Sequence, residues 1–144
     1  MVELNNISGT IPEGVGELSN LNNLLLWNNN LSGILPQKLG SNGNLLSLDV
    51  SSNSLTGLIP PNLCQFVDLS KNNFTGEIPE DLGYAPTLQF LNISENSFNA
   101  ALPSNIWSAP SLQILLASSA KLTGKIPDFI GCKNVYKIEL FLGH

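Results

Sequence analysis

The sequence has little charge and no arginine. Only 12% of its 144 residues are charged, half the roughly 25% of ordinary soluble domains. Six lysines against eleven acidic residues leave a net charge of -5, so no basic stripe can neutralise phosphates. This argues against nucleic acid and acidic membrane surfaces as partners. Polarity comes from amides and hydroxyls instead, because 19 asparagines and 16 serines accompany 26 leucines.

Histidine and cysteine are also scarce. The single histidine, His144, is the last residue, and no paired carboxylates suggest acid–base chemistry. We therefore predict no catalytic residue, no metal site, no cofactor and no enzymatic activity. Cys64 and Cys132 are too few for a disulfide scaffold or a zinc site, and we expect both thiols to be free.

Long apolar runs are missing as well. No window approaches the roughly 20 apolar residues that span a bilayer, and MVELNNISG lacks the basic start and apolar stretch of a signal peptide. The sequence as written predicts neither a membrane span nor a leader. With 42% hydrophobic residues the chain can still form the core of one domain.

The informative feature is an internal repeat, LxxLxLxxNxL followed by GxIP. Its closing asparagine recurs at steps of 24, 24, 19 and 24 residues. These ladder asparagines are Asn5, Asn29, Asn53, Asn72 and Asn96. The repeat predicts a single domain, 1–144, of about six coils. The expected boundaries are 1–20 (partial), 21–44, 45–63 (short), 64–87, 88–111, 112–134 and 135–144 (partial).

Apolar residues within each unit alternate with polar or variable ones, which is the period of a strand with one buried face. The expected inward pairs are Leu24 and Leu26, Leu48 and Val50, Val67 and Leu69, Leu91 and Ile93, and Leu115 and Ala117. Inside the following turn we expect Leu31, Leu55, Phe74, Phe98 and Leu122. On the return side we expect Leu35, Ile59, Ile78, Leu102 and Ile126, each followed by a proline.

Proline cannot continue a strand ladder, so each one is expected to begin a short 3₁₀-like segment. The fold class predicted is α/β, a right-handed solenoid. Its parallel β-sheet lines the concave face, and turns and short 3₁₀ helices cover the convex face. The repeated asparagine has a backbone role, because an amide can satisfy buried polar groups that otherwise cost about 1–3 kcal/mol each. Ala120 takes this position in the coil 112–134, so we expect the ladder to weaken toward the C-terminus.

The 19-residue step marks one shortened coil. Losing five residues from the strand would break its register, so we expect the deficit in the return between Leu63 and Val67. Cys64 would then replace the first leucine of its coil as a small buried residue.

Outward residues of successive strands form a continuous surface in a solenoid, and this surface is the predicted binding site. The candidate contacts are Trp27, Asp49, Ser51, Phe66, Asp68, Ser70, Phe90, Asn92 and Ser94. The aromatic rings would pack against apolar or proline residues of an extended peptide, and the two aspartates would accept its hydrogen bonds or cations. The alternative is that Asp and Ser here only keep an exposed sheet soluble.

Four N-x-S/T triplets predict glycosylation if the chain enters the secretory route. They begin at Asn6, Asn30, Asn73 and Asn92. Three directly follow a ladder asparagine, where we expect an exposed bend, whereas Asn92 lies on a predicted strand. Chance is the alternative explanation in a sequence so rich in asparagine.

The string NLSGxxPxxLGxxxNLxxLDVSSNSLTGxIP resembles the plant-specific class of leucine-rich repeats, found in ectodomains of receptor-like kinases and in cell-wall inhibitor proteins. The segment from FVDLSKNNF to KNVYKIEL is similar to ectodomains of receptors for the tracheary element differentiation inhibitory peptide, a CLE-type hormone. The resemblance implies non-catalytic recognition of an extracellular peptide or protein, with a co-receptor as a further partner. It also implies an extracellular or plasma-membrane location.

The sequence departs from that family in several ways. It contains no kinase motif, no paired-cysteine cap and no transmembrane helix, and the resemblance implies an RxR pair for the peptide's carboxyl end that this arginine-free chain lacks. We therefore expect a truncated relative. Two alternatives stay open: a secreted wall-defence protein that inhibits a polysaccharide hydrolase, and a truncated gene product without a binding function.

Overall fold

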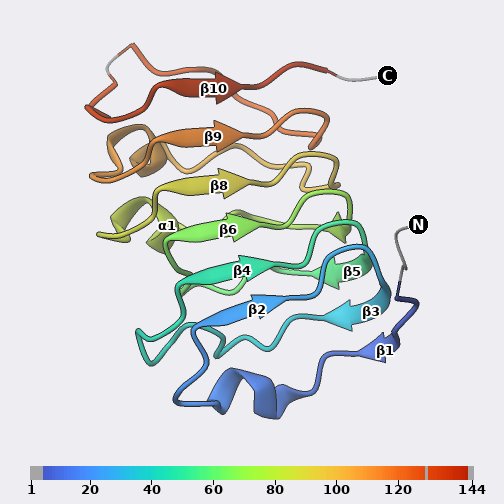
Figure 1. The fold of residues 1–144 in the computed structure, drawn as a ribbon. Helices are drawn as coiled ribbons and strands as arrows, with labels where there is room; N and C mark the ends of the chain where they lie inside the picture. The colour runs from blue at the N-terminus through green and yellow to red at the C-terminus, as the bar shows by residue number, and fades with distance from the viewer. Residues whose placement is uncertain (1–4, 129, 143–144) are drawn as a thin grey trace, which may run out of the picture.

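The computed structural model describes residues 5–128 and 130–142 and consists of stacked coils (Figure 1). One strand from each of six successive coils joins a parallel sheet, in the order β10-β9-β8-β6-β4-β2. These strands are β2 (Asn23–Leu25), β4 (Ser47–Asp49), β6 (Phe66–Asp68), β8 (Phe90–Asn92), β9 (Ile114–Leu116) and β10 (Lys137–Glu139). The predicted parallel-stranded solenoid is confirmed.

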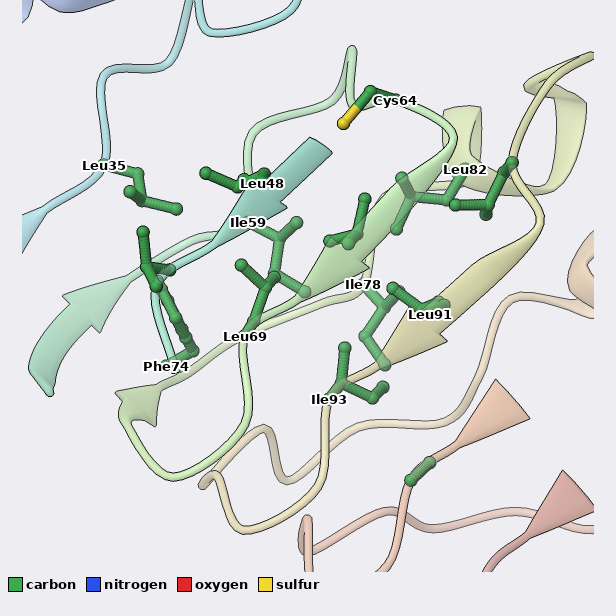
Figure 2. Close-up of a cluster of buried hydrophobic side chains, with 14 of the residues drawn as sticks. Leu35, Leu48, Ile59, Cys64, Leu69, Phe74, Ile78, Leu82, Leu91 and Ile93 are labelled. Carbon is green, nitrogen blue, oxygen red and sulfur yellow. The ribbon is translucent and has the colours of Figure 1, made fainter. Parts of the chain in front are cut away.

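Residues at the same position of the repeat pair with one another across this sheet. Leu48 pairs with Val67, which pairs with Leu91, and all three are completely buried. Figure 2 shows Leu48, Leu69, Leu91 and Ile93 from successive coils converging on one core. Leu24 and Leu26, in the coil of the edge strand β2, are half-buried but still pack against that core. The predicted inward face is therefore correct.

A second parallel sheet was not foreseen from the sequence. It has the order β1-β3-β5-β7 and runs beside the first (Figure 1). Its strands are β1 (Ser8–Thr10), β3 (Asn30–Ile34), β5 (Ser54–Gly57) and β7 (Asn73–Phe74). The pattern suggested turns here because the strands are short and most contain glycine, which usually weakens a strand.

A left-handed residue before ladder positions 29, 53, 72, 96 and 120 turns the chain from the first sheet toward the second. These residues are Asn28, Ser52, Lys71, Glu95 and Ser119, with φ between 53° and 59°. The ladder asparagine then ties the two sheets together. The Nδ2 of Asn72 donates to the carbonyls of Val50, Leu69 and Ser70, while its Oδ1 accepts from the amide of Leu55 in β5.

Asn29, Asn53 and Asn96 repeat this arrangement. Asn5 belongs to the first described coil and is exposed. Ala120 lacks the amide, and its own carbonyl oxygen instead accepts from the amide of Phe98 at 3.2 Å. Only an isolated bridge between Ala101 and Thr123 continues the second sheet in this region. A backbone acceptor thus replaces the side-chain amide at this position, and the weakening of the ladder stays a prediction.

Three return segments form short helices, namely η1 (Glu13–Glu17), α1 (Asp81–Tyr84) and η2 (Ser104–Ser108). Of the five prolines expected to begin such segments, only Pro103 is directly followed by a 3₁₀ helix, and the other one, η1, follows Pro12. Pro79 precedes α1, a single α-helical turn, whereas Pro36 and Pro60 precede turns and bends, so the prediction for each proline was too general. Among the return-side residues Leu35, Ile59 and Ile78 are buried. Leu102 and the turn residue Leu122 are only half-buried.

The prediction for Ile126 was wrong, because its side chain is 56% exposed. Ile126 lies in the return segment of the coil 112–134, and residues 130–142 form no further return segment that packs against it. Within the described residues, no helix is long and apolar enough to cross a bilayer.

The short coil keeps its strands and has a shortened return segment. Cys64 is 4% exposed in the position of a first leucine, and it is close to the core residues in Figure 2. The return now lies directly on Gly40, where a Cβ would collide with the carbonyl oxygen of Asn62. A hollow of about 520 Å³ remains beside it, lined by the turn at Gly40 and by residues 84–87. Both cysteines are free, as expected.

Candidate functional site

The outward residues of the six-stranded sheet form three rows across the strands, and we call this surface the six-stranded face. The first row is Asn23, Ser47, Phe66, Phe90, Ile114 and Lys137. The second row is Leu25, Asp49, Asp68, Asn92, Leu116 and Glu139. Backbone hydrogen bonds between coils continue beyond the ends of the strands and align a third row. This row is Trp27, Ser51, Ser70, Ser94 and Ser118.

Two phenylalanines from neighbouring strands stack at the centre of the first row. The rings of Phe66 and Phe90 lie 4.4 Å apart between centroids and 7° from parallel. A hollow of about 500 Å³ adjoins them, lined in part by Gln65, Gln89 and Gln113. A half-exposed aromatic platform beside amide groups can hold an apolar side chain and hydrogen-bond the backbone next to it.

The glutamines of this hollow were missed at the sequence level. Each of Gln65, Gln89 and Gln113 stands one residue before the first outward residue of its strand, and the 24-residue spacing between them was available as a signal. The carbonyl of Gln65 accepts from the amides of Gln89 and Phe90, so the backbone at this edge is fixed by the sheet.

Asp49 and Asp68 are direct neighbours in the second row. In each case Oδ1 accepts a 2.7 Å hydrogen bond from the serine hydroxyl two residues later and a 3.0 Å bond from the same serine's amide. The serines, Ser51 and Ser70, therefore hold the two carboxylates in place. All four of these serine bonds go to Oδ1, so the serines leave Oδ2 of each carboxylate unbonded by them.

Burial raises the pKa of Asp68, and the neighbouring charge of Asp49 adds to this effect. Hydrogen bonds from Ser70 and from the side chain of Asn92 oppose it by stabilising the carboxylate. Two neighbouring carboxylates make this part of the surface negative, so a positively charged group placed here would relieve the repulsion between them.

The remaining predicted contacts differ in how much surface they offer. Trp27 is 53% exposed at the end of the third row, whereas Ser70 is only 8% exposed. Ser51 and Ser94 are half-buried. Ser70 mainly positions Asp68, so the accessible surface of the predicted set is concentrated on the aromatic rings and the aspartates.

The predicted glycosylation residues fall into two groups. Asn6, Asn30 and Asn73 are exposed, and the last two begin strands of the second sheet rather than lying in a bend. Asn92 is half-buried, and its Oδ1 accepts from the amide of Ser94 at 3.1 Å. Since Asn92 also stands directly beside Asp68 in the second row, we expect no glycan at Asn92.

The described residues contain no group of three or more His, Cys, Asp or Glu side chains placed to hold a metal ion. Burial raises the pKa of the Cys64 thiol to about 11 and also raises that of Cys132. Both are therefore protonated near neutral pH, which is the unreactive form of a thiol.

Comparison with known proteins identifies the repeats. The Leucine Rich Repeat family model matches residues 44–66, 64–85 and 87–109. No protein with a curated description matches significantly.

Three solved structures are informative. A TDR receptor is 42% identical over 94% of this chain, with a TM-score of 0.52, and the chain covers 33% of it. The Arabidopsis receptor kinase HAESA, solved with the peptide hormone IDA and the co-receptor SERK1, is 32% identical over 93% of this chain and 25% of its own, with a TM-score of 0.81. A plant ice-binding protein is 30% identical over 96% of this chain and 46% of its own, with a TM-score of 0.82.

The chain thus spans about a third of the TDR receptor chain and a quarter of the HAESA chain. The residues that the family model matches lie in the coils whose strands form the parallel sheets of this chain. The chain is a leucine-rich repeat solenoid that is similar in sequence and fold to parts of plant receptor ectodomains.

Proposed function

We propose that the chain is a non-catalytic module that binds an extended peptide across the six-stranded face. The observation that carries this proposal is the Phe66–Phe90 stack lying directly beside the Asp49–Asp68 pair. The platform lies on β6 and β8 and the negative pair on β4 and β6, with Asp68 two residues after Phe66 on the shared strand β6. Together they can bind an apolar and a basic residue of one ligand.

The geometry of the sheet limits the ligand. Alternate residues along a strand lie about 6.6 Å apart, so the platform and the carboxylates are about as far apart as residues i and i+2 of an extended peptide. We therefore infer a ligand with an apolar residue or proline over the stack and a basic residue or amino terminus at Asp49 and Asp68. The absence of arginine makes this negative site, rather than a carboxyl-binding site, the main charged contact.

The similar receptor structures support a proposal for the location of the chain and for a second partner. The TDR and HAESA structures are of receptors, and HAESA was solved with a co-receptor. We propose an extracellular setting for this chain as well, with a co-receptor contacting the ligand once it is bound.

Calorimetric titration with synthetic CLE-type peptides tests the proposal. We expect binding at micromolar concentration that weakens in Phe66→Ala and in Asp68→Asn. Tyr84→Ala is the matched control, because Tyr84 is a 70% exposed aromatic on α1, away from this face. Absence of heat for every peptide, or equal losses in Tyr84→Ala, would reject the proposal. Inhibition of a polygalacturonase without peptide binding would replace it with the wall-defence function.

Ice binding is a second candidate function. The plant ice-binding protein covers nearly the whole of this chain at a TM-score of 0.82. Only 12% of the residues of this chain are charged, so most of its polar groups are neutral, as the water molecules of ice are. We expect the chain, produced without glycans, to inhibit ice recrystallisation. A chain that leaves ice growth unchanged at all concentrations would remove this candidate and leave the peptide proposal untouched.

A further inference from the structure

The outer surface of the second sheet is uncharged and rich in hydroxyl groups. No residue of β1, β3, β5 or β7 is charged. We call this surface the hydroxyl face. Its exposed residues are Ser8, Thr10, Asn30, Ser32, Ile34, Ser54, Thr56, Asn73 and Thr75.

Strand pairing arranges these side chains in rows. Thr10 pairs with Ser32, and Ser32 pairs with Ser54, so three hydroxyls stand side by side on successive strands. Thr56 likewise stands between Ile34 and Asn73. Neighbouring strands lie about 4.8 Å apart, and alternate residues of one strand lie about 6.6 Å apart. The result is a two-dimensional array of oxygens with two fixed repeat distances.

Two of the hydroxyl groups lie near backbone carbonyls of the preceding coil. The Oγ of Ser32 lies 3.5 Å from the carbonyl oxygen of Gly9, and Oγ1 of Thr56 lies 3.4 Å from that of Gly33. Each bond joins a side chain to the preceding coil. Short serine and threonine side chains on a hydrogen-bonded sheet lose less entropy when they order water than long surface side chains would.

Glycines let methyl groups lie close against the sheet between the hydroxyls. A Cβ on Gly33 would come within 2.9 Å of the Thr10 methyl carbon, and one on Gly57 within 2.6 Å of a methyl carbon of Ile34. The absent side chains therefore leave room for these methyl groups. The face thus alternates small apolar patches with hydroxyls, at spacings set by the backbone.

We propose that the hydroxyl face is the surface through which this chain binds ice, an inference that rests on the second candidate function above. Ice presents a neutral, periodic lattice of oxygens, and a rigid array of hydroxyls and methyl groups matches it without burying an unpaired charge. The six-stranded face cannot do this, because aspartates and aromatic rings interrupt its rows.

The same face contains two predicted glycosylation residues, Asn30 and Asn73. Both are exposed and stand within the array, one at the start of β3 and one at the start of β7. A branched sugar on either residue would hold the sheet away from a crystal surface. Glycosylation therefore determines whether this face can reach ice, while the six-stranded face stays open to peptide.

The test uses the whole chain produced in bacteria, with ice recrystallisation inhibition and capture by growing ice as readouts. We expect Thr56→Lys to abolish both, because a lysine would project from the middle of the array. Thr87→Lys is the matched control, since Thr87 is exposed on the return side after α1. Circular dichroism verifies that both variants remain folded, and Thr56→Val, which removes only the hydroxyl, is expected to weaken inhibition if Thr56→Lys proves unstable.

The second part of the test uses the glycosylated chain produced in a plant host. We expect it to be inactive on ice and to regain activity in the Asn30→Gln/Asn73→Gln double variant. An unmodified chain with no effect on ice would refute the candidate function itself. An active chain whose activity survives both Thr56 substitutions, or survives a glycan on Asn30, would show that ice binds elsewhere on the molecule.

Discussion

The two parallel sheets of this solenoid follow the same repeat with different registers. In the six-stranded sheet, equivalent residues pair, as Leu48 does with Val67 and Leu91. In the four-stranded sheet the pairing slips by two positions, because Ser32 pairs with Ser54 although Thr56 occupies its place in the repeat. A two-residue slip keeps every side chain on its own face, so both sheets retain a buried and an exposed side.

The difference shows that a sequence repeat determines which residues are buried more directly than it determines which residues become neighbours. On the six-stranded face the rows could be read from the sequence. On the hydroxyl face Thr56 stands beside Ile34, a neighbour that the repeat does not predict. Hydrogen bonds of the ladder asparagines connect the two sheets, so substituting one of these residues tests how far the stability of one sheet depends on the other.

The largest effect is expected for Asn72→Ala, which removes a residue that bonds both sheets. Asn72 is 6% exposed and makes three donated bonds and one accepted bond. Leaving several of these buried backbone groups unpaired should lower the free energy of unfolding by about 3 kcal/mol or more. Urea denaturation of Asn72→Ala against the exposed control Asn62→Ala measures this. Equal midpoints for the two variants would mean that the sheets do not need the amide.

A smaller effect is expected for Gly57→Ala, which acts on the four-stranded sheet alone. Gly57 has φ of +81°, and an added Cβ would press on Ile34. The left-handed backbone and the contact together should cost about 1–2 kcal/mol. Gly14→Ala is the control, because Gly14 has open space around it and no positive φ. We expect hydrogen exchange to accelerate in β3 and β5 more than in β4 and β6, and a uniform change would contradict independent registers.

The two sheets also differ in how much of each could be predicted, because a sequence repeat indicates burial more directly than it indicates neighbours. The repeat located the six-stranded sheet, its buried face and the replacement of a leucine by Cys64, because burial follows the alternation of side chains. It did not predict the second sheet. Its segments are short and most contain glycine, so they suggested turns although exposed Ser and Thr residues alternate along them. The stacking of Phe66 on Phe90 and the buried position of Ser70 depend on contacts between coils, which no single unit of the sequence contains.

Raised pH should weaken the six-stranded sheet first, because Cys64 lies just before β6 and its Sγ is 3.4 Å from the carbonyl oxygen of Phe66. Burial raises the folded-state pKa to about 11 from an ordinary value of 9.0, so the unfolded chain ionises first. The free energy of unfolding is then unaffected below pH 9 and falls by about 2 kcal/mol as the pH rises through this window.

Denaturation of the wild type and of Cys64→Ala between pH 8 and 11 isolates this contribution, since the two proteins differ only at the thiol. We expect a steeper decline in the wild type. Parallel pH profiles would show that the thiol does not couple to folding.

The smallest effect is expected for Ala120→Asn, which adds the missing ladder amide. Ala120 is 2% exposed, and its backbone carbonyl already accepts from the amide of Phe98. A side-chain oxygen there would take over that bond, as Oδ1 of Asn96 takes the amide of Phe74, and could extend the second sheet beyond the Ala101–Thr123 bridge. The gain should be within about 1 kcal/mol, because one satisfied acceptor replaces another. Slower hydrogen exchange at Phe98 and Thr123 would support this, whereas a loss of stability would show that the alanine coil has closed around its smaller residue and that the second sheet ends there for reasons of packing.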